Sequence, residues 1–181
     1  MLDTRETIMA LGRATAQAHG YGGLSFRELA KAVGVKSASI HYHFPTKADL
    51  GAALARRYCE DAQATLAAIR AESADAATCL RRYTDVFRLA LANDNRMCMC
   101  GFMAAENDDL PDAVKREVQA FADLNVAWLA DVLGGSEDAR RQALAIFAAV
   151  GGAQLIARSR GDIAVFDGII ESCRVAGLIP G

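Results

Sequence analysis

Residues 24–50 constrain the fold of this 181-residue chain more than any other stretch. Ser25 and Glu28 have the spacing of a capping box, which satisfies the free N–H groups at the start of a helix. Four apolar residues then recur at helical spacing: Phe26, Leu29, Ala30 and Val33. Gly34 follows and supplies the backbone freedom of a tight turn between two helices. The segment therefore begins as a short helix followed by a turn.

A second short helix is expected over residues 37–43, with Ser37 as its N-cap. Pro45 ends it, because proline disfavours helical geometry in the preceding residue. Thr46 and Asp49 form the next capping box and open a third helix. The pattern of this segment is that of a helix-turn-helix.

The second short helix carries small, hydrogen-bonding side chains where a solvated helix would carry Glu and Lys. Such a helix can enter the major groove of DNA. The alternative is an ordinary pair of packed helices, but packing alone explains the Tyr-His-Phe-Pro-Thr-Lys run poorly. We expect contacts to bases or the adjacent backbone from Lys36, Ser37, Ser39 and His41. We expect contacts to phosphates from Tyr42, Thr46 and Lys47.

This segment resembles the signature of the TetR-type (TetR/AcrR family) transcriptional regulators, L-A-x-x-x-G-V, a short run, then Y-x-H-F-x-(S/T)-K-x-x-L. The matching residues are Leu29, Ala30, Gly34, Val35, His43, Phe44, Thr46, Lys47 and Leu50. His41 departs from it, because the family usually has tyrosine there, and Ala38 replaces a frequent glycine. The resemblance implies a ligand-responsive regulator, most often a repressor, that binds a palindromic operator as a homodimer.

Charge and composition fit a chain with one DNA-binding end. The net charge is −2, yet residues 1–50 carry six basic and four acidic side chains. This small basic excess suggests that one head binds DNA weakly and that two are needed. Hydrophobic residues make up 52% of the chain and its three prolines are widely spaced, which favours an all-α fold of about nine helices. We expect a DNA-binding domain over residues 1–50 and an effector-binding and dimerisation domain over residues 51–181.

Several helices outside the helix-turn-helix are marked by local patterns. The first is expected from Asp3 to about Gly20, with Asp3 and Glu6 as a capping box. Its expected inner face is Ile8, Leu11, Thr15 and Ala18. A helix over about 75–93 carries apolar residues at helical spacing: Leu80, Tyr83, Phe87 and Leu91. Nearer the C-terminus, Ser136 is expected to cap one helix, Gly161 to end it and Asp162 to cap the next.

Residues 137–160 and 162–176 form two apolar helices near the C-terminus. Little other chain remains to cover them, which suggests a self-association surface. The Gly151-Gly152 pair would let two backbones approach closely. The alternative is that both helices only close the core of one subunit; the family resemblance favours a four-helix dimer bundle.

A small-molecule effector pocket is expected between the central helices. Its candidate lining combines apolar walls with few polar groups, as such pockets require. The candidates are Phe87, Met99, Phe102, Met103, Asn125 and Trp128. The alternative reading for each of them is ordinary core packing.

Cys98 and Cys100 lie in a Met-Cys-Met-Cys-Gly run where a helix is expected to begin, beside Arg96. The positive end of a helix favours the thiolate, so either thiol could sense oxidants or electrophiles. Some TetR-type repressors with a similar cysteine respond to such reagents. The alternative is that both are inert apolar residues.

Other classes of function find little support in the sequence. No nucleotide-binding, hydrolase or zinc-protease motif occurs, so an enzyme is not expected. The five cysteines are scattered, and neither a disulfide framework, a metal site nor a cofactor is predicted. Glu106, Asp108 and Asp109 are explained as a solvated loop. An architectural DNA-binding protein would not need so large a helical body.

No apolar stretch is long enough for a membrane span and no signal pattern opens the chain, so a cytoplasmic location is expected.

Overall fold

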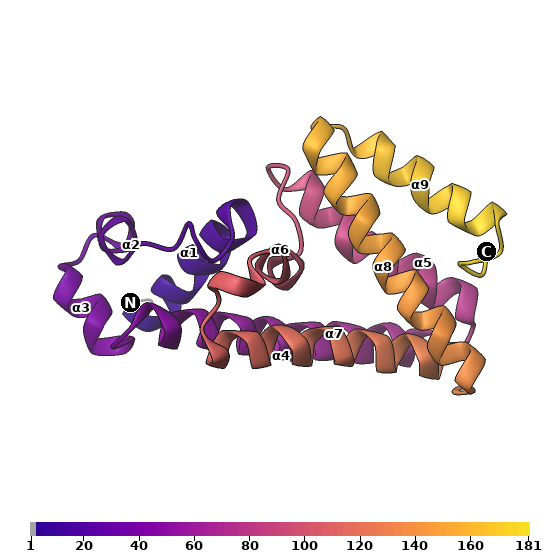
Figure 1. The fold of residues 1–181 in the computed structure, drawn as a ribbon, viewed down its shortest axis with the longest axis horizontal. Coiled ribbons are helices and arrows are strands. Elements are labelled where there is room, and N and C mark those ends of the chain that lie inside the picture. Colours follow the sequence, from indigo (N-terminus) through magenta and orange to yellow (C-terminus); the bar gives the residue numbers. More distant parts are fainter. Residues whose placement is uncertain (1–2) are drawn as a thin grey trace. The chain divides into compact units, whose positions relative to one another are not determined.

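The computed structural model describes residues 3–181, which fold into nine α-helices and one short 3₁₀ helix without a β-strand (Figure 1). The prediction of an all-α chain is therefore confirmed. The helices are α1 (Thr4–His19), α2 (Phe26–Val33), α3 (Ser37–His43), α4 (Lys47–Glu72), α5 (Ala76–Ala92), α6 (Met99–Ala105), α7 (Asp112–Val132), α8 (Glu137–Arg160) and α9 (Ile163–Val175), with the 3₁₀ helix η1 at Asn107–Asp109.

The chain forms two compact units, and each contains two separate stretches of sequence. The first runs to Glu60 and adds Met99–Phe121, so that α6 and the first half of α7 belong with α1–α3. The second contains Asp61–Cys98 and Ala122–Gly181. The predicted division of functions after residue 50 stays a prediction.

The inner face of α1 differs from the predicted one. We expected Ile8, Leu11, Thr15 and Ala18 to face inward, whereas the buried residues are Ile8, Met9, Gly12 and Ala16. Gly12 is in close contact with α4, since a Cβ at this position would lie 3.1 Å from Leu54 Cδ1. The observed inner face differs from the predicted one because small residues, Gly12 and Ala16, are buried there, and small residues give little hydropathy signal.

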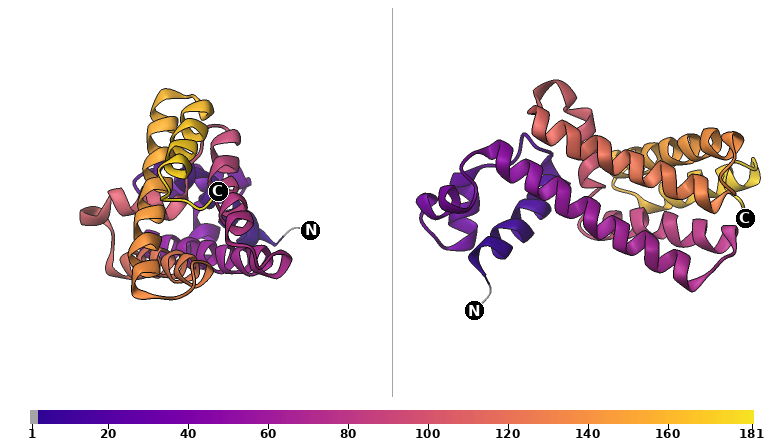
Figure 2. Two further views of the ribbon diagram at one scale, coloured as in Figure 1. Left: turned by 90° about the vertical axis from the view of Figure 1, so that its right-hand side faces the viewer. Right: turned by 90° about the horizontal axis from the view of Figure 1, so that it is seen from below.

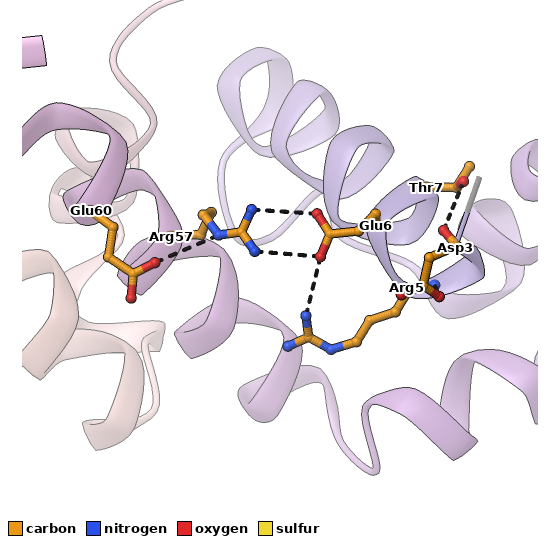
Figure 3. Close-up of polar contacts among 6 residues, drawn as sticks. All are labelled: Asp3, Arg5, Glu6, Thr7, Arg57 and Glu60. Carbon is orange, nitrogen blue, oxygen red and sulfur yellow. Dashed lines mark hydrogen bonds and ion pairs between the residues drawn. The ribbon is translucent and has the colours of Figure 1, made fainter. Parts of the chain in front are cut away.

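Ion pairs connect the start of α1 to α4 (Figure 3). Asp3 caps α1 by accepting the Arg5 N–H at 3.1 Å. Glu6 does not complete the predicted capping box with Asp3; its carboxylate faces Arg57, with both contacts at 3.4 Å, and Arg5 at 3.5 Å. These side chains are partly exposed, so each pair stabilises the fold by no more than about 1 kcal/mol.

The second unit is built on α5, α8 and α9, and Figures 1 and 2 show α8 and α9 side by side. The predicted apolar positions of α5 (Leu80, Tyr83, Phe87 and Leu91) are all buried. The side chain of Gln154 in α8 is fully buried. It accepts the Cys98 N–H and donates to the Phe87 carbonyl oxygen, both at 2.8 Å. A buried amide with both ends satisfied fixes the position of the chain before α6.

Candidate nucleic-acid interface

The turn between α2 and α3 has a well-defined hydrogen-bonded geometry. The Glu28 N–H donates to the Ser25 hydroxyl at the start of α2. At the other end Gly34 has φ = 80° and ψ = 29°, the left-handed conformation that glycine adopts without strain. The Val35 N–H reaches back to the Ala30 carbonyl oxygen at 2.9 Å, which is the Schellman pattern. The predicted helix-turn-helix is therefore present, with α3 as its second helix.

The cap of α3 differs from the prediction. Lys36 is the N-cap and makes no side-chain capping bond, whereas Ser37 is the first helical residue. Lys36, the last residue of the turn, has an extended backbone (φ −75°, ψ 148°), and the helical conformation begins directly after it. The Ser37 hydroxyl is thereby left exposed at the front of the helix.

The two faces of α3 differ sharply in burial. Ile40 is completely buried and Phe44, which follows the helix, is nearly so. On the other face Lys36, Ser37, His41 and Tyr42 are exposed, Tyr42 at 84%, and Ser39 is half-buried. The helix thus presents short polar side chains and two exposed rings outward.

The His41 ring is held in place although it is exposed. Its Nδ1 lies 3.2 Å from the Pro45 carbonyl oxygen, and its edge packs on Phe26 of α2 with ring centroids 4.8 Å apart. If Nδ1 donates to that carbonyl, the Nε2 of the neutral ring is an acceptor. A fixed acceptor or donor on the outer side of α3 can discriminate between bases.

The start of α4 has the predicted capping box in full. The Thr46 N–H donates to the Asp49 carboxylate at 2.9 Å, and the Asp49 N–H donates to the Thr46 hydroxyl at 3.1 Å. Thr46 is exposed and lies at a helix N-terminus, where the backbone favours an anion such as phosphate.

Lys47 is more constrained than the sequence suggested. Its Nζ donates to the Gly22 carbonyl oxygen at 3.2 Å and lies over the Tyr21 ring, 4.5 Å from the centroid. An ammonium group has three donors, so this contact leaves capacity for a phosphate. The predicted phosphate contact therefore starts from a fixed position.

Two residues near this surface were missed by the sequence reasoning. Arg27 extends from the first turn of α2 with 90% of its side chain exposed, and it forms an ion pair with the adjacent Glu28. Glu106 is not the solvated loop residue we expected. Its carboxylate accepts the Tyr21 N–H at 2.6 Å and the Gly22 N–H at 2.8 Å. Arg27 could have been found from the sequence, because it is a basic residue within the helix-turn-helix. Glu106 could not, because its partners Tyr21 and Gly22 lie 85 and 84 residues away in the chain and leave no local pattern.

The six predicted effector residues divide between the two units. Phe87, Asn125 and Trp128 are in the second unit, where the Tyr83 hydroxyl donates to Asn125 Oδ1 at 3.1 Å and Trp128 Nε1 donates to the Leu66 carbonyl oxygen at 3.1 Å. Burial, with a smaller effect of Cys98, raises the pKa of Tyr83 well above its ordinary value, so its hydroxyl stays protonated. Met99, Phe102 and Met103 are in the first unit, and both methionines are fully buried.

A surface groove of about 380 Å³ lies along α9 and includes none of the six predicted effector residues. Its lining is mostly apolar: Val165, Gly168, Ile169, Ser172, Cys173, Ala176 and Leu178. The groove lies on one of the two helices predicted to form a dimer.

Both predicted sensor thiols are buried. Cys98 is 4% exposed and Cys100 is 1% exposed, and α6 begins at Met99, one residue after Cys98. Arg96, expected to favour the thiolate, pairs with Asp94 at 3.4 Å. A reagent can therefore reach either sulfur only when the surrounding chain opens.

The described residues contain neither a metal-binding group of side chains nor a helix that could span a membrane. Within residues 3–181, no three His, Cys, Asp or Glu side chains are grouped so as to hold a metal ion. None of the helices in that range has both the length and the apolarity of a bilayer span.

Comparison with known proteins identifies the family. Residues 8–54 match the model of the bacterial regulatory proteins of the tetR family. A TetR transcriptional regulator from Legionella pneumophila is 33% identical over 93% of this chain and 94% of its own, with a TM-score of 0.88. A TetR-family regulator from Agrobacterium tumefaciens is 32% identical over 92% of this chain and 93% of its own, with a TM-score of 0.87.

A more distant structure has the same fold. The reduced form of NemR from E. coli is 21% identical over 98% of this chain and 97% of its own, with a TM-score of 0.83. The matched segment at residues 8–54 contains the whole helix-turn-helix described above. The chain therefore belongs to the TetR family of bacterial transcriptional regulators, and it is a DNA-binding regulator rather than an enzyme.

Proposed function

We propose that this protein is a ligand-responsive transcriptional repressor that binds a palindromic operator as a homodimer. The observation that carries the proposal is the outer face of α3, whose short polar side chains are exposed while Ile40 anchors the inner face. In this scheme an effector favours a separation of the two heads that no longer fits successive major grooves, and the operator is released.

Each head would read the operator through α3 and hold it through the start of α4. Lys36, Ser37, Ser39 and His41 are the proposed contacts to bases or the adjacent backbone. Tyr42, Thr46 and Lys47 are the proposed phosphate contacts, and Arg27 is a further candidate because of its exposure. Phosphate contacts fix register, whereas contacts to base edges fix the sequence.

The proposed dimer forms through the outer faces of α8 and α9. Leu144 and Leu155 are each 57% exposed on α8, although the inner face of that helix is buried. Gly151, Gly152 and Gly168 face open space, because a Cβ at any of them would meet nothing within 4 Å. Exposed apolar side chains beside bare backbone are what a closely approaching second copy requires.

The proposed effector is a small molecule bound in the helical body, in the second unit at Phe87, Asn125 and Trp128 or in the first unit at Met99, Phe102 and Met103. Trp128 is the only tryptophan of the chain, so its fluorescence reports on this region without labelling. We expect a true effector to change that fluorescence and to displace the protein from its operator at the same concentrations. A compound that does only one of these would not be the effector.

A reactive electrophile or oxidant acting at Cys98 or Cys100 is the second candidate for the releasing signal. The specific observation in its favour is that the Cys98 N–H is bonded to Gln154 of α8, a helix of the proposed dimer. Modification of Cys98 would therefore disturb a segment connected to that surface.

The whole proposal is tested by selecting duplexes from a random library with the full-length chain. We expect a palindrome whose half-sites lie about one helical turn apart or a multiple of it, bound by two subunits. Footprinting and light scattering of the complex give the half-sites and the stoichiometry. Selection of a single half-site bound by one subunit would contradict the proposal.

A further inference from the structure

The turn between α1 and α2 is held by residues distant in the sequence. Within the turn, the Gly23 N–H bonds to the His19 carbonyl oxygen and the Leu24 N–H bonds to the Tyr21 carbonyl oxygen. The Tyr21 and Gly22 N–H groups are instead bound by the Glu106 carboxylate at 2.6 and 2.8 Å. Hydrogen bonds to a charged acceptor are stronger than those between neutral groups.

The backbone of the turn is shaped to accept this carboxylate. Gly20 has φ = 69°, and a Cβ on it would collide with both oxygens of Glu106. A Cβ on Gly22 would also approach that carboxylate, at 3.0 Å. Glycine at these positions lets Glu106 reach the amides directly.

The opposite side of the same turn is held from the start of α4. Lys47 donates to the Gly22 carbonyl oxygen and covers the Tyr21 ring, which is buried. Tyr21 also packs against α4 at Gly51, where a Cβ would lie 2.7 Å from the ring. We name the assembly of Glu106, Lys47 and the Gly20–Gly23 turn the turn clip.

Glu106 directly follows the short helix α6 and lies in the same unit as the turn. Its carboxylate therefore joins the end of α6 to the α1–α2 turn. Loss of this carboxylate would leave the Tyr21 and Gly22 amides without their charged acceptor.

We propose that Glu106 is a positioning residue that holds the α1–α2 turn of the DNA-binding head in the conformation that binds the operator. The inference rests on the proposed function, because it concerns operator binding. Glu106 itself does not contact DNA in this scheme. Its effect reaches DNA through the backbone of the α1–α2 turn, and the proposed phosphate contact of Lys47 is kept.

The test compares Glu106→Ala and Glu106→Gln with wild type in the full-length dimer, using the operator duplex obtained by selection. We expect Glu106→Ala to raise the operator Kd about tenfold, the order that follows from losing part of a charge-assisted hydrogen bond. Glu106→Gln keeps one acceptor oxygen, so its Kd should rise less. The salt dependence of binding should not change in either variant, because no phosphate contact is removed.

Hydrogen exchange and a control separate positioning from simple loss of stability. The Tyr21 and Gly22 amides should exchange faster in Glu106→Ala, while those of α5 and α8 keep their protection. The matched control is Glu117→Ala, which removes a carboxylate of α7 bonded to Arg56 of α4 at 2.6 and 3.0 Å in the same unit. This control should leave the operator Kd within twofold of wild type.

Two results would overturn the inference. One is fast exchange of the turn amides in Glu106→Ala with an unchanged or lower operator Kd. Another is that the Tyr21 and Gly22 amides of Glu106→Ala exchange as slowly as in wild type, which would mean that Glu106 does not hold them. Should Glu106→Ala not fold, the same criteria apply to Glu106→Gln. A wild-type chain that selects no duplex would instead contradict the proposed function itself.

Discussion

At the scale of single residues, Lys47 has a structural role that bears on its proposed contact with a phosphate. It is bound to the Gly22 carbonyl oxygen and stacked on Tyr21, so its position is set before any DNA arrives. A fixed ammonium group loses less conformational entropy on binding than a free one. This arrangement would pre-position Lys47 for the proposed phosphate contact.

Replacing Lys47 by Ala should weaken binding to all DNA sequences by a similar factor. The slope of log Kd against log salt concentration should fall by about one for each head, because one phosphate contact is lost. Titrations of the selected operator and of a scrambled duplex at several salt concentrations provide the measurement. A change of base preference with an intact salt slope would mean that Lys47 reads bases.

The two buried thiols provide the second prediction at this scale. If they sense electrophiles, N-ethylmaleimide should lower the operator affinity of wild type, and Cys98→Ser or Cys100→Ser should retain it. Because both sulfurs are buried, modification should be slow and limited by opening of the chain. Unchanged operator affinity in fully modified wild type would leave both cysteines as packing residues.

What could be predicted at the residue scale depended on the range of the interaction. Thr46 and Asp49 were predicted correctly because a capping box needs only four consecutive residues. The inner face of α1 was wrong because Gly12 and Ala16 are buried without a hydropathy signal. Glu106 was missed because its partners lie in another part of the chain. Base preference is not readable at all, since it depends on the complex with DNA.

At the scale of whole helices, the helix starts and ends were encoded locally. The Ser136 hydroxyl accepts an N–H at the start of α8, and Gly161 ends it in the left-handed conformation, both as predicted. Asp162 then caps α9. The packing of these helices on others needed the three-dimensional structure, as the pair between Arg88 of α5 and Asp167 of α9 illustrates.

The Arg88–Asp167 pair predicts a pH-dependent contribution to stability. Arg88 donates to both Asp167 oxygens at 2.7 and 2.9 Å, and this bonding lowers the pKa of Asp167 below its ordinary value. Asp167→Asn should therefore cost about 0.5–1 kcal/mol of unfolding free energy at pH 7, a modest value because both side chains are partly exposed.

The sign of the pH dependence follows from the lowered pKa. The stabilisation by this pair is fully present above about pH 4, the ordinary pKa of aspartate. It is lost as the pH falls through the lowered pKa of Asp167 in the folded protein. Denaturant titrations should thus show the difference between wild type and Asp167→Asn shrinking in acid. Glu171→Gln, which removes only a local pair within α9, should change stability little at any pH.

At the scale of the whole molecule, the outer faces of α8 and α9 predict the oligomeric state. Leu155→Arg should dissociate the dimer, because the charge would have to be buried between the two copies. Leu89→Arg is the matched control, since Leu89 is exposed to a similar degree (65% against 57%) but lies on α5, outside the proposed interface.

Sedimentation of the two variants gives the measurement. We expect monomers for Leu155→Arg and dimers for Leu89→Arg, with both chains folded because neither side chain is buried in one subunit. The monomeric variant should also lose operator affinity, since one weakly basic head then binds alone. Dimers in both variants would place the interface elsewhere.

The contact between Glu106 and the turn also bears on how the protein is made. During synthesis the residues of α1–α3 leave the ribosome long before Glu106 does, and the Tyr21 and Gly22 amides must first bond to water. The head acquires the Glu106 contacts of its turn only after α6 has been synthesised, so a nascent or truncated chain that ends near residue 54 carries the complete helix-turn-helix sequence without them. On the inference drawn above, such a chain would bind the operator less tightly than the full-length protein.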